Sequence, residues 1–375
     1  MSGSLLLSVL TGGDAATRLS PRGWEQLLRE ARTPQLTARI GQQAKDQGWY
    51  DRVPVRPRRH FEAMHRTCVS QQHMVRWELG QIERALAPLD APVVLLKGAA
   101  SLMAGLPVAD GRIFSDVDIM VPRDRLQQAE AALIARGWIS NVHGYDRQYY
   151  ERWAHELPPL QHVQRASVID LHHTITPPVS RTPVDATKLF ARARPLDGSK
   201  FFFVLAPADM LLHSAVHLMQ EGEFERGLRD LVDLDALFRD FGRDSGFWPT
   251  LLERASEHRL GRPLYYAVQQ VRSLLGTPMP RDFLAAIDRS RPAFITRRAM
   301  GGLLRTGIVG ATARGATWRG DVARGLLYIR GHYMRMPLRL LIPHLIRKSG
   351  SHLAFLGRGR SVQSIPAGGN APGAI

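Results

Sequence analysis

Two aspartates, Asp116 and Asp118, lie one residue apart inside the apolar stretch GRIFSDVDIMV. The side-chain period of a β-strand is two residues, so both carboxylates project from one face, and Val117, Ile119 and Val121 form the core-facing set. Two carboxylates about 7 Å apart on a partly buried face repel each other. A cation between them removes that repulsion, and oxygen ligands of this kind suit Mg²⁺. The stretch therefore predicts a strand that holds a metal ion.

The composition is typical of a folded protein with more than one domain. The chain has 375 residues, of which 44% are hydrophobic and 22% charged, and this favours two or three domains. Cys68 is the single cysteine, so an internal disulfide is excluded and a reducing cytoplasm is the expected location. The first residues lack the basic segment of a signal peptide, and no stretch reaches the ~18 apolar residues of a membrane span. Peripheral contact with a membrane stays open.

Hydrophobic periodicity and chain breakers divide the sequence into four predicted segments. Residues 1–88 have apolar side chains at helical spacing and predict an N-terminal helical region, which ends where the following Asp-Ala-Pro breaks the pattern. Residues 89–205 mix short apolar runs with helical patterns and predict an α/β unit. Residues 206–350 predict a basic helical domain, and the Gly/Pro/Ser-rich residues 351–375 predict a disordered tail. The expected fold class is therefore α+β, with helical domains on both sides of a small α/β unit.

Three features of the α/β unit form one predicted site. An apolar strand ends at Lys97-Gly98, where the glycine lets a phosphate approach the backbone N–H groups at the start of a helix. The strand of the paired aspartates follows, and Asp170 lies in a later strand-like run, VIDLH. Three carboxylates on neighbouring strands can hold two Mg²⁺ ions, which stabilise the entering and leaving oxygens of an in-line phosphoryl displacement. The order of these features predicts a magnesium-dependent phosphoryl-transfer site.

This order of elements resembles the nucleotidyltransferase superfamily of the DNA polymerase β type. At the level of residues, VVLLKGAASLMAGLPVADGRIFSDVDIMVPRDRLQQAEAALIARGW is similar to an uncharacterised nucleotidyltransferase family, whose pattern has a Leu-Lys-Gly motif, an arginine shortly before an Asp-x-Asp strand, and a later Gly-aromatic pair. The resemblance extends less sharply from about Trp77 to about Phe238. It implies a mixed sheet in the α/β unit and binding of a nucleoside triphosphate such as ATP.

The resemblance also implies roles for individual residues. Asp170 matches the family's third carboxylate, because it lies in the same Val-Asp-Leu-His type of block. Ala99 follows Gly98 where the wider superfamily has a serine, and this departure leaves the choice of nucleotide open. The implied metal-binding and catalytic residues are Asp116, Asp118 and Asp170, and the implied nucleotide-binding residues are Lys97, Gly98 and Arg112.

Two histidines, His213 and His217, lie in the predicted helix ADMLLHSAVHLMQ. Their i, i+4 spacing places both side chains on one helix face. Three interpretations stay open: packing against the α/β unit, contact with the nucleotide or acceptor, and a transition-metal site. We take His217 as a candidate nucleotide-binding residue. Arg229 and Asp230, in the next predicted helix, are interpreted as an ordinary ion pair.

The positive charge of the chain is concentrated in its C-terminal part. From Arg289 onward there are fifteen Lys or Arg residues and one acid, Asp321, so this segment carries +14 of the net charge of +16. A basic segment with Leu, Ile and Tyr can bind an anionic membrane surface, RNA or an acidic peptide, or it can be a solvated Arg-rich face. Pro337 and Pro343 interrupt it and argue against one long helix lying on a membrane.

Together these features predict a nucleotidyltransferase that uses Mg²⁺, with two ions implied, and moves an NMP from an NTP to an acceptor hydroxyl or phosphate. The resemblance to tailoring enzymes implies a peptide, a saccharide or a small molecule as the acceptor. Two alternatives stay open: a catalytically quiet nucleotide-binding regulatory protein, and an RNA-directed nucleotidyltransferase that uses the basic tail. Asp118→Asn is expected to abolish Mg²⁺-dependent NTP consumption and, because it relieves the repulsion between the two aspartates, to keep or raise the thermal stability.

Overall fold

The structure, a computed structural model, describes residues 4–199, 201–220, 222, 224–310 and 318–341. Residues up to Met336 form one compact unit, and those from Pro337 onward form a second. The elements described below belong to the first unit. No described helix has both the length and the apolar character needed to cross a bilayer. The predicted disordered segment 351–375 lies outside the described residues, and the predicted domain boundaries stay predictions.

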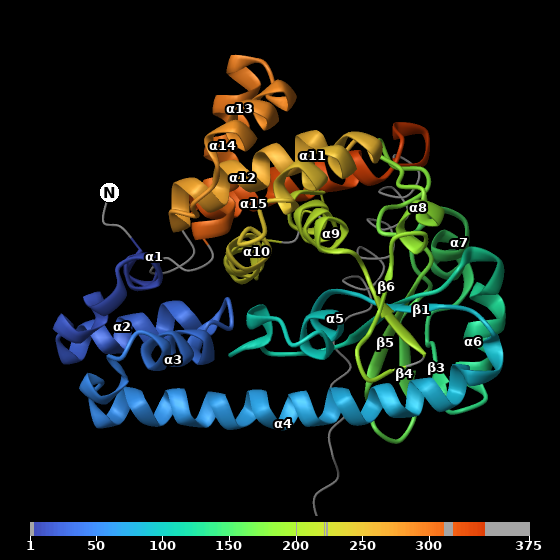
Figure 1. Ribbon diagram of the computed structural model, residues 1–375, viewed down its shortest axis with the longest axis horizontal. Coiled ribbons are helices and arrows are strands. Elements are labelled where there is room, and N and C mark those ends of the chain that lie inside the picture. Colours follow the sequence, from blue (N-terminus) through green and yellow to red (C-terminus); the bar gives the residue numbers. More distant parts are fainter. Residues whose placement is uncertain (1–3, 200, 221, 223, 311–317, 342–375) are drawn as a thin grey trace, which may run out of the picture. The chain divides into compact units, whose positions relative to one another are not determined.

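The N-terminal region is helical, as its periodicity predicts. Ser20 caps the second helix by accepting a hydrogen bond from the backbone N–H of Gly23, and Pro21 occupies the first turn, where its missing N–H costs nothing. The fourth helix has 32 residues and runs alongside the other N-terminal helices and on beneath the α/β unit (Figure 1). The helices of this region are α1 (Leu5–Thr11), α2 (Pro21–Arg32), α3 (Thr37–Asp46) and α4 (Val55–Leu86).

The described strands form one mixed sheet in the order β3-β4-β5-β2-β1-β7-β6. β2 pairs antiparallel with β1 and parallel with β5, and β1 pairs parallel with β7. This mixed sheet among many helices confirms the α+β fold class. The strands are β1 (Val93–Leu95), β2 (Val117–Met120), β3 (Trp138–Ile139), β4 (Leu160–His162), β5 (Val168–His172), β6 (Arg194–Pro195) and β7 (Phe202–Val204).

β2, the strand of the paired aspartates, lies in the middle of the sheet. Val117 and Ile119 are buried in the hydrophobic core, as the alternation of the sequence predicts. Across the parallel ladder, Asp118 is the register partner of Asp170 on β5. Since directly paired residues of neighbouring strands point to the same face, the sheet itself brings these two carboxylates together.

Helices cover the sheet and continue the chain beyond it. Within the α/β unit they are α5 (Lys97–Met103), α6 (Leu126–Ile134), α7 (Gly144–Trp153) and α8 (Ala186–Phe190). From Pro207 onward the described chain is helical, as predicted, and α9 packs against α10, α11 and α12. These later helices are α9 (Pro207–Gln220), α10 (Gly227–Phe241), α11 (Phe247–Glu257), α12 (Gly261–Leu275), α13 (Arg281–Ile287), α14 (Phe294–Gly310) and α15 (Trp318–Arg335).

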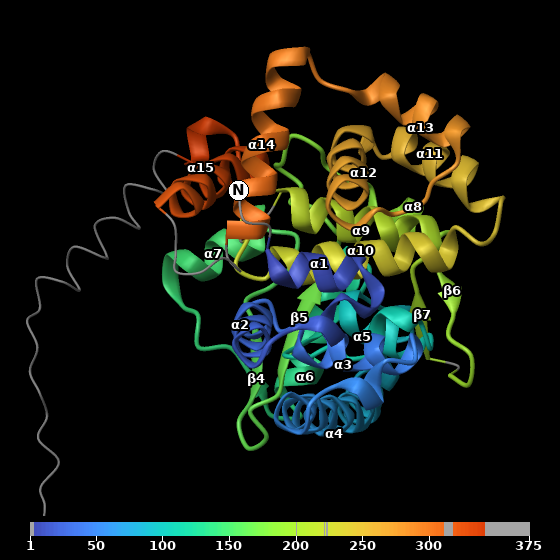
Figure 2. The same ribbon diagram turned by 90° about the vertical axis from the view of Figure 1, so that its left-hand side faces the viewer.

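The last two helices, α14 and α15, lie side by side and complete the first unit (Figure 2). α15 also contacts α9, which in turn contacts α5 of the α/β unit. Helix α15 is therefore joined to the α/β unit through α9.

Candidate active site

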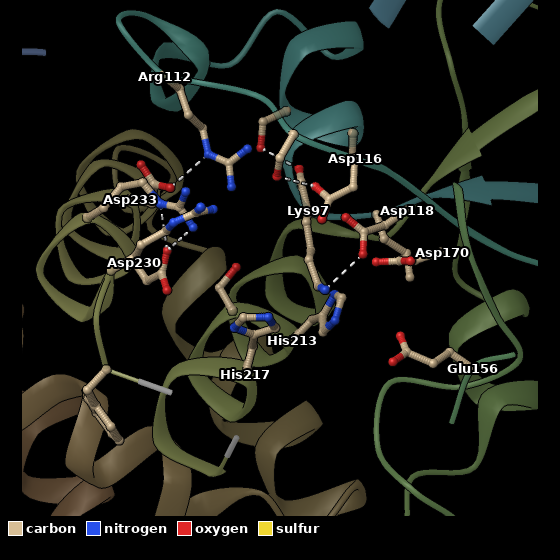
Figure 3. Close-up of a pocket in the computed structure, with 18 of the residues that line it drawn as sticks. Lys97, Arg112, Asp116, Asp118, Glu156, Asp170, His213, His217, Asp230 and Asp233 are labelled. Atoms are coloured by element: carbon tan, nitrogen blue, oxygen red, sulfur yellow. Dashed lines mark hydrogen bonds and ion pairs between the residues drawn. The ribbon is translucent and has the colours of Figure 1, made fainter. Parts of the chain in front are cut away.

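Three predicted acids, Asp116, Asp118 and Asp170, line one cavity (Figure 3). Asp118 and Asp170 are register partners on adjacent parallel strands, and Asp116 precedes β2 on the same side-chain face. The side chain of Asp118 is only 3% exposed. The structure thus brings together the three carboxylates that the sequence singles out.

Glu156 is a fourth carboxylate at this place, and the sequence did not indicate it. It precedes β4 and forms an isolated antiparallel bridge with His172, which puts its side chain near the end of β5. Its Oε2 lies 3.2 Å from His172 Nε2, and its side chain faces Asp170 across the cavity (Figure 3). The local sequence HELPPL contains no pattern that indicates a functional residue. Glu156 reaches the site only because its segment pairs with β5 in the folded chain. We call Asp116, Asp118, Asp170 and Glu156 the acid cluster.

The acid cluster strongly perturbs the ionisation of Asp170. Burial raises its pKa, and the negative charges of Asp118, Glu156 and Asp116 raise it further, to about 7. A carboxyl group with this pKa is partly protonated near neutrality, because a further charge in the cluster is unfavourable. Binding of a cation would therefore favour loss of the proton from Asp170 and add one negative charge to the site.

Asp118 behaves in the opposite way. Burial opposes its ionisation, but the ammonium group of Lys97 and the hydrogen bond from His172 hold the pKa of Asp118 well below its usual range. Lys97 Nζ and His172 Nε2 lie 2.8 Å and 3.1 Å from the same oxygen, Oδ1. His172 is fully buried, and Nδ1 of its ring has no hydrogen-bond partner among the described residues. Asp118 is therefore a permanently charged carboxylate oriented by two neighbours.

Lys97 and Gly98 occupy the turn from β1 into α5, as predicted. Lys97 has a φ of 44°, in the left-handed region that side chains rarely adopt. A Cβ atom on Gly98 would collide with Nη1 of Arg112, so the glycine makes room for this guanidinium. In this structure Arg112, rather than open space for a phosphate, lies against Gly98.

Arg112 is anchored on the far side of the cavity from Glu156 (Figure 3). Its Nε donates to Asp233 Oδ2 over 2.9 Å, and Nη2 of Arg39 donates to Asp233 Oδ1 over 3.2 Å. Asp233 on α10 thereby joins the N-terminal helix α3 to the loop before β2. No local sequence pattern indicates this contact, which links residues more than a hundred positions apart.

The two predicted histidines lie in different environments. His213 is buried, and burial together with the nearby charge of Lys97 lowers its pKa well below the usual value, so the ring is neutral. His217 is partly exposed and lines the cavity. Arg229 and Asp230 form the predicted ion pair, at 2.8 Å.

One group of side chains has the geometry of a transition-metal site, and it is not the predicted histidine pair. His155, Glu156 and His172 each offer a ligand atom, and these atoms lie within 4.8 Å of one another. Among the described residues His213 and His217 join no such group of three. The group of His155 overlaps the acid cluster through Glu156, so it forms part of the same cavity wall.

The cavity has a volume of about 980 Å³. This is at the upper end of the range of about 300–1,000 Å³ for sites that bury a whole ligand, so it has room for two reactants. Lys97 lies close to Asp118, and Arg112 lies on the side of the cavity away from Glu156 (Figure 3). The cationic residues that line it are Lys97, Arg112, Arg226, Arg229, Arg324 and Arg335.

A family model described as an uncharacterised nucleotidyltransferase matches residues 20–276. The chain belongs to this family. No curated protein and no solved structure matched the chain. The match spans the acid cluster, Lys97, Arg112 and both predicted histidines, and it ends in the residue after α12. Membership of the uncharacterised nucleotidyltransferase family supports a nucleotidyl-transfer activity in general. The helices α14 and α15 lie beyond the matched residues.

Proposed function

We propose that this chain is a Mg²⁺-dependent nucleotidyltransferase that moves an NMP from an NTP to a hydroxyl or phosphate oxygen of an acceptor. The observation that carries the proposal is the register pairing of Asp118 with Asp170, with Asp116 on the same face. Family membership supports the reaction class, and the three carboxylates support the metal dependence.

The donor set fits magnesium. Asp116, Asp118 and Asp170 offer oxygen atoms, which this cation prefers. The raised pKa of Asp170 reflects its burial together with the negative charges of the neighbouring acids, which a divalent cation would compensate. When bound there, Mg²⁺ would supply charge stabilisation for the phosphoryl oxygens of the reacting nucleotide. Asp118 is held in one orientation by Lys97 and His172, so its carboxylate is preorganised for this task.

The remaining steps rest on the residues of the chain. The acceptor oxygen forms a bond to the α-phosphorus, the bond from that phosphorus to the bridging oxygen breaks, and pyrophosphate leaves. Where the acceptor is a hydroxyl, its proton passes to the carboxylate of Asp170, which lies beside Asp118 on the neighbouring strand. Arg112, His217 and Arg229 also line the cavity, and we expect them to contact phosphate oxygens or the nucleoside.

The test compares nucleotide binding and turnover in matched variants. The purified chain is titrated with α,β-methylene-ATP and with analogues of the other nucleotides, with Mg²⁺ and with EDTA. Release of pyrophosphate from the natural NTPs is followed in parallel. We expect the parent to bind nucleotide only when Mg²⁺ is present. In Asp118→Asn, Mg²⁺ should no longer increase the affinity for nucleotide. Asp124→Asn, which changes a side chain that is 78% exposed, should bind like the parent. Equal binding by all three proteins, or binding indifferent to Mg²⁺, would refute the proposal. Because the NMP needs an acceptor, pyrophosphate release in this assay measures transfer to water, so its presence supports turnover and its absence does not argue for the regulatory alternative.

A further inference from the structure

The helix α15 contributes to the wall of the active-site cavity although it lies outside the residues that the family model matches. Arg324, Tyr328 and Arg335 face the same cavity as the acid cluster, and we call these three residues the α15 wall. They recur at intervals of four and seven residues, which places them on one side of the helix. The cavity is therefore completed by a segment outside the residues that the family model matches.

Close packing of small residues fixes α15 against α14. A Cβ atom on Gly307 of α14 would lie 2.5 Å from Leu327 Cδ1, so the glycine leaves room for this leucine in its present position. Gly320, Ala323 and Leu327 are buried at intervals of three and four residues along α15. The opposite side of the helix is left for other contacts.

Three further contacts tie α15 to the elements that carry the site. Gly222, after α9, has a φ of 82°, and a Cβ atom there would lie 3.0 Å from Tyr328 Cα, so the chain passes very close to α15. Nη1 of Arg330 donates to the carbonyl of Met219 on α9. Nε of Arg181, in the segment after β5, donates to the carbonyl of Tyr333 over 3.2 Å. These contacts hold the α15 wall at the cavity.

Arg324 has unused hydrogen-bonding capacity. Its Nη2 pairs with Asp321 Oδ1 at 2.5 Å, and the side chain of Asp321 is 54% exposed. Its Nη1 is buried and has no hydrogen-bond partner in the described part of the chain. A buried donor without an acceptor is unfavourable. Nη1 packs beside Gly310 of α14, so an oxyanion in the cavity would meet the exposed part of the guanidinium, whose side chain is 20% exposed. The planar guanidinium matches the two oxygens of a phosphate or carboxylate better than any neutral group.

We propose that the α15 wall binds the acceptor, and that this acceptor carries a phosphate or carboxylate group. This inference rests on the proposed nucleotidyl transfer. Nucleotide and cation are common to the reaction of the whole family, and the acid cluster with Lys97 and Arg112 lies within the matched residues. The other reactant, the acceptor, is then expected to bind at the part of the cavity that is lined by residues outside the match. Arg324 and Arg335 bind its anionic group, and Tyr328 contacts the neighbouring part of the molecule.

The experiment measures anion and nucleotide binding separately in the full chain. The anionic probes are glycerol 3-phosphate and succinate, glycerol is the neutral control, and each is titrated with Mg²⁺ and saturating α,β-methylene-ATP present. The variants are Arg324→Gln and Arg335→Gln, and Arg324→Lys keeps the charge without the planar fork. Arg319→Gln is the matched control, because Arg319 is exposed on the same helix and does not line the cavity. Circular dichroism and thermal melts establish that each variant is folded.

We expect the parent and Arg319→Gln to bind an anionic probe more tightly than glycerol. Each glutamine variant should bind it at least about tenfold more weakly, since a charge-assisted hydrogen bond is lost. Arg324→Lys should lie between, and the affinity for α,β-methylene-ATP should stay within about twofold of the parent. If the glutamine variants lose nucleotide affinity to the same extent, the arginines hold nucleotide phosphates and the inference is wrong. If the parent binds nucleotide but prefers neither anion over glycerol, the inference also falls while the proposed function stands. A parent that binds no nucleotide overturns both.

Discussion

Lys97 Nζ lies 2.8 Å from Asp118 Oδ1, and the carboxylate is almost completely buried while the lysine side chain is 22% exposed. His172 contacts the same oxygen from the neighbouring strand. Burial of a lone carboxylate is costly, and these two partners reverse its effect, so the pKa of Asp118 lies well below its usual range. The Lys97–Asp118 pair is therefore part of the stability of the fold as well as part of the site.

Asp118→Asn is expected to lower the free energy of unfolding in EDTA. The substitution leaves Lys97 buried without its anion, and breaking one side of a buried pair costs about 3–5 kcal/mol, with the lower end expected because the lysine is partly exposed. Because the pKa of Asp118 is depressed in the folded state, its stabilising contribution is present above the ordinary carboxyl pKa and is lost as pH falls through the folded pKa. Urea unfolding at pH 7 checks this, with Asp124→Asn as the control. Equal midpoints for parent and Asp118→Asn would contradict it.

This expectation reverses the one drawn from the sequence. The spacing of Asp116 and Asp118 shows two like charges on one face, and repulsion alone favours a neutral substitute. The compensating charge comes from Lys97, which the sequence assigns to a phosphate turn, and from His172, two residues beyond Asp170. These tertiary contacts stabilise the charged form of Asp118 and not that of Asp170.

Asp170→Asn is expected to raise the free energy of unfolding in EDTA. The folded pKa of Asp170 is raised to about 7, so its ionisation destabilises the folded state above the usual carboxyl pKa, and the penalty is complete above pH 7. Asparagine removes a penalty on the order of a few kcal/mol at pH 8 and a smaller one at pH 5. Melting curves of parent and variant at the two pH values provide the measurement. A variant that gains nothing at pH 8, or gains more at pH 5, would show that Asp170 is not strained by the cluster.

The sequence predicted those parts of the fold and site that depend on local periodicity. The alternation in β2 identified its core-facing residues, and the apolar run VIDLH placed Asp170 on a strand. Parallel pairing of β2 with β5 then brought Asp170 opposite Asp118. The sequence was therefore sufficient to predict that the three acids lie on neighbouring strands.

The parts that the sequence could not predict arise from contacts between distant segments. Glu156 reaches the acid cluster through a single bridge with His172, and Asp233 joins Arg39 to Arg112 across three segments. The basic C-terminal residues predicted a surface for a membrane, for RNA or for a peptide, whereas part of α15 lines the cavity. No local pattern encodes which side of a basic helix faces inward, since both sides carry arginine.

Gly98→Ala is expected to destabilise the chain and weaken nucleotide binding. A methyl group at this position collides with Nη1 of Arg112, so the guanidinium must leave Gly98 and strain its contact with Asp233. Overpacking of this kind costs about 1–3 kcal/mol. The matched control is Gly80→Ala in α4, where nothing lies within 4 Å of the added Cβ and alanine favours the helix. Thermal melts and Mg²⁺–nucleotide titrations of both variants are compared with the parent. Similar gains in stability for the two variants would show that Arg112 moves away without cost.

The affinity for Mg²⁺ and nucleotide is expected to depend on pH through Asp170. A proton and a cation compete for this carboxylate, and its pKa in the metal-free site is raised to about 7 by burial and by the neighbouring acids. Affinity should therefore be nearly constant above pH 8 and fall about tenfold between pH 8 and pH 6, because one proton must be displaced there. Calorimetric titration with Mg²⁺ and α,β-methylene-ATP at pH 6, 7 and 8 in buffers of different ionisation enthalpy measures both the affinity and the protons released. In Asp170→Asn the affinity should be lower at every pH and the dependence should disappear. A parent whose affinity is flat from pH 6 to pH 8, with no proton released, would exclude Asp170 from the metal site even if the other two aspartates bind the ion.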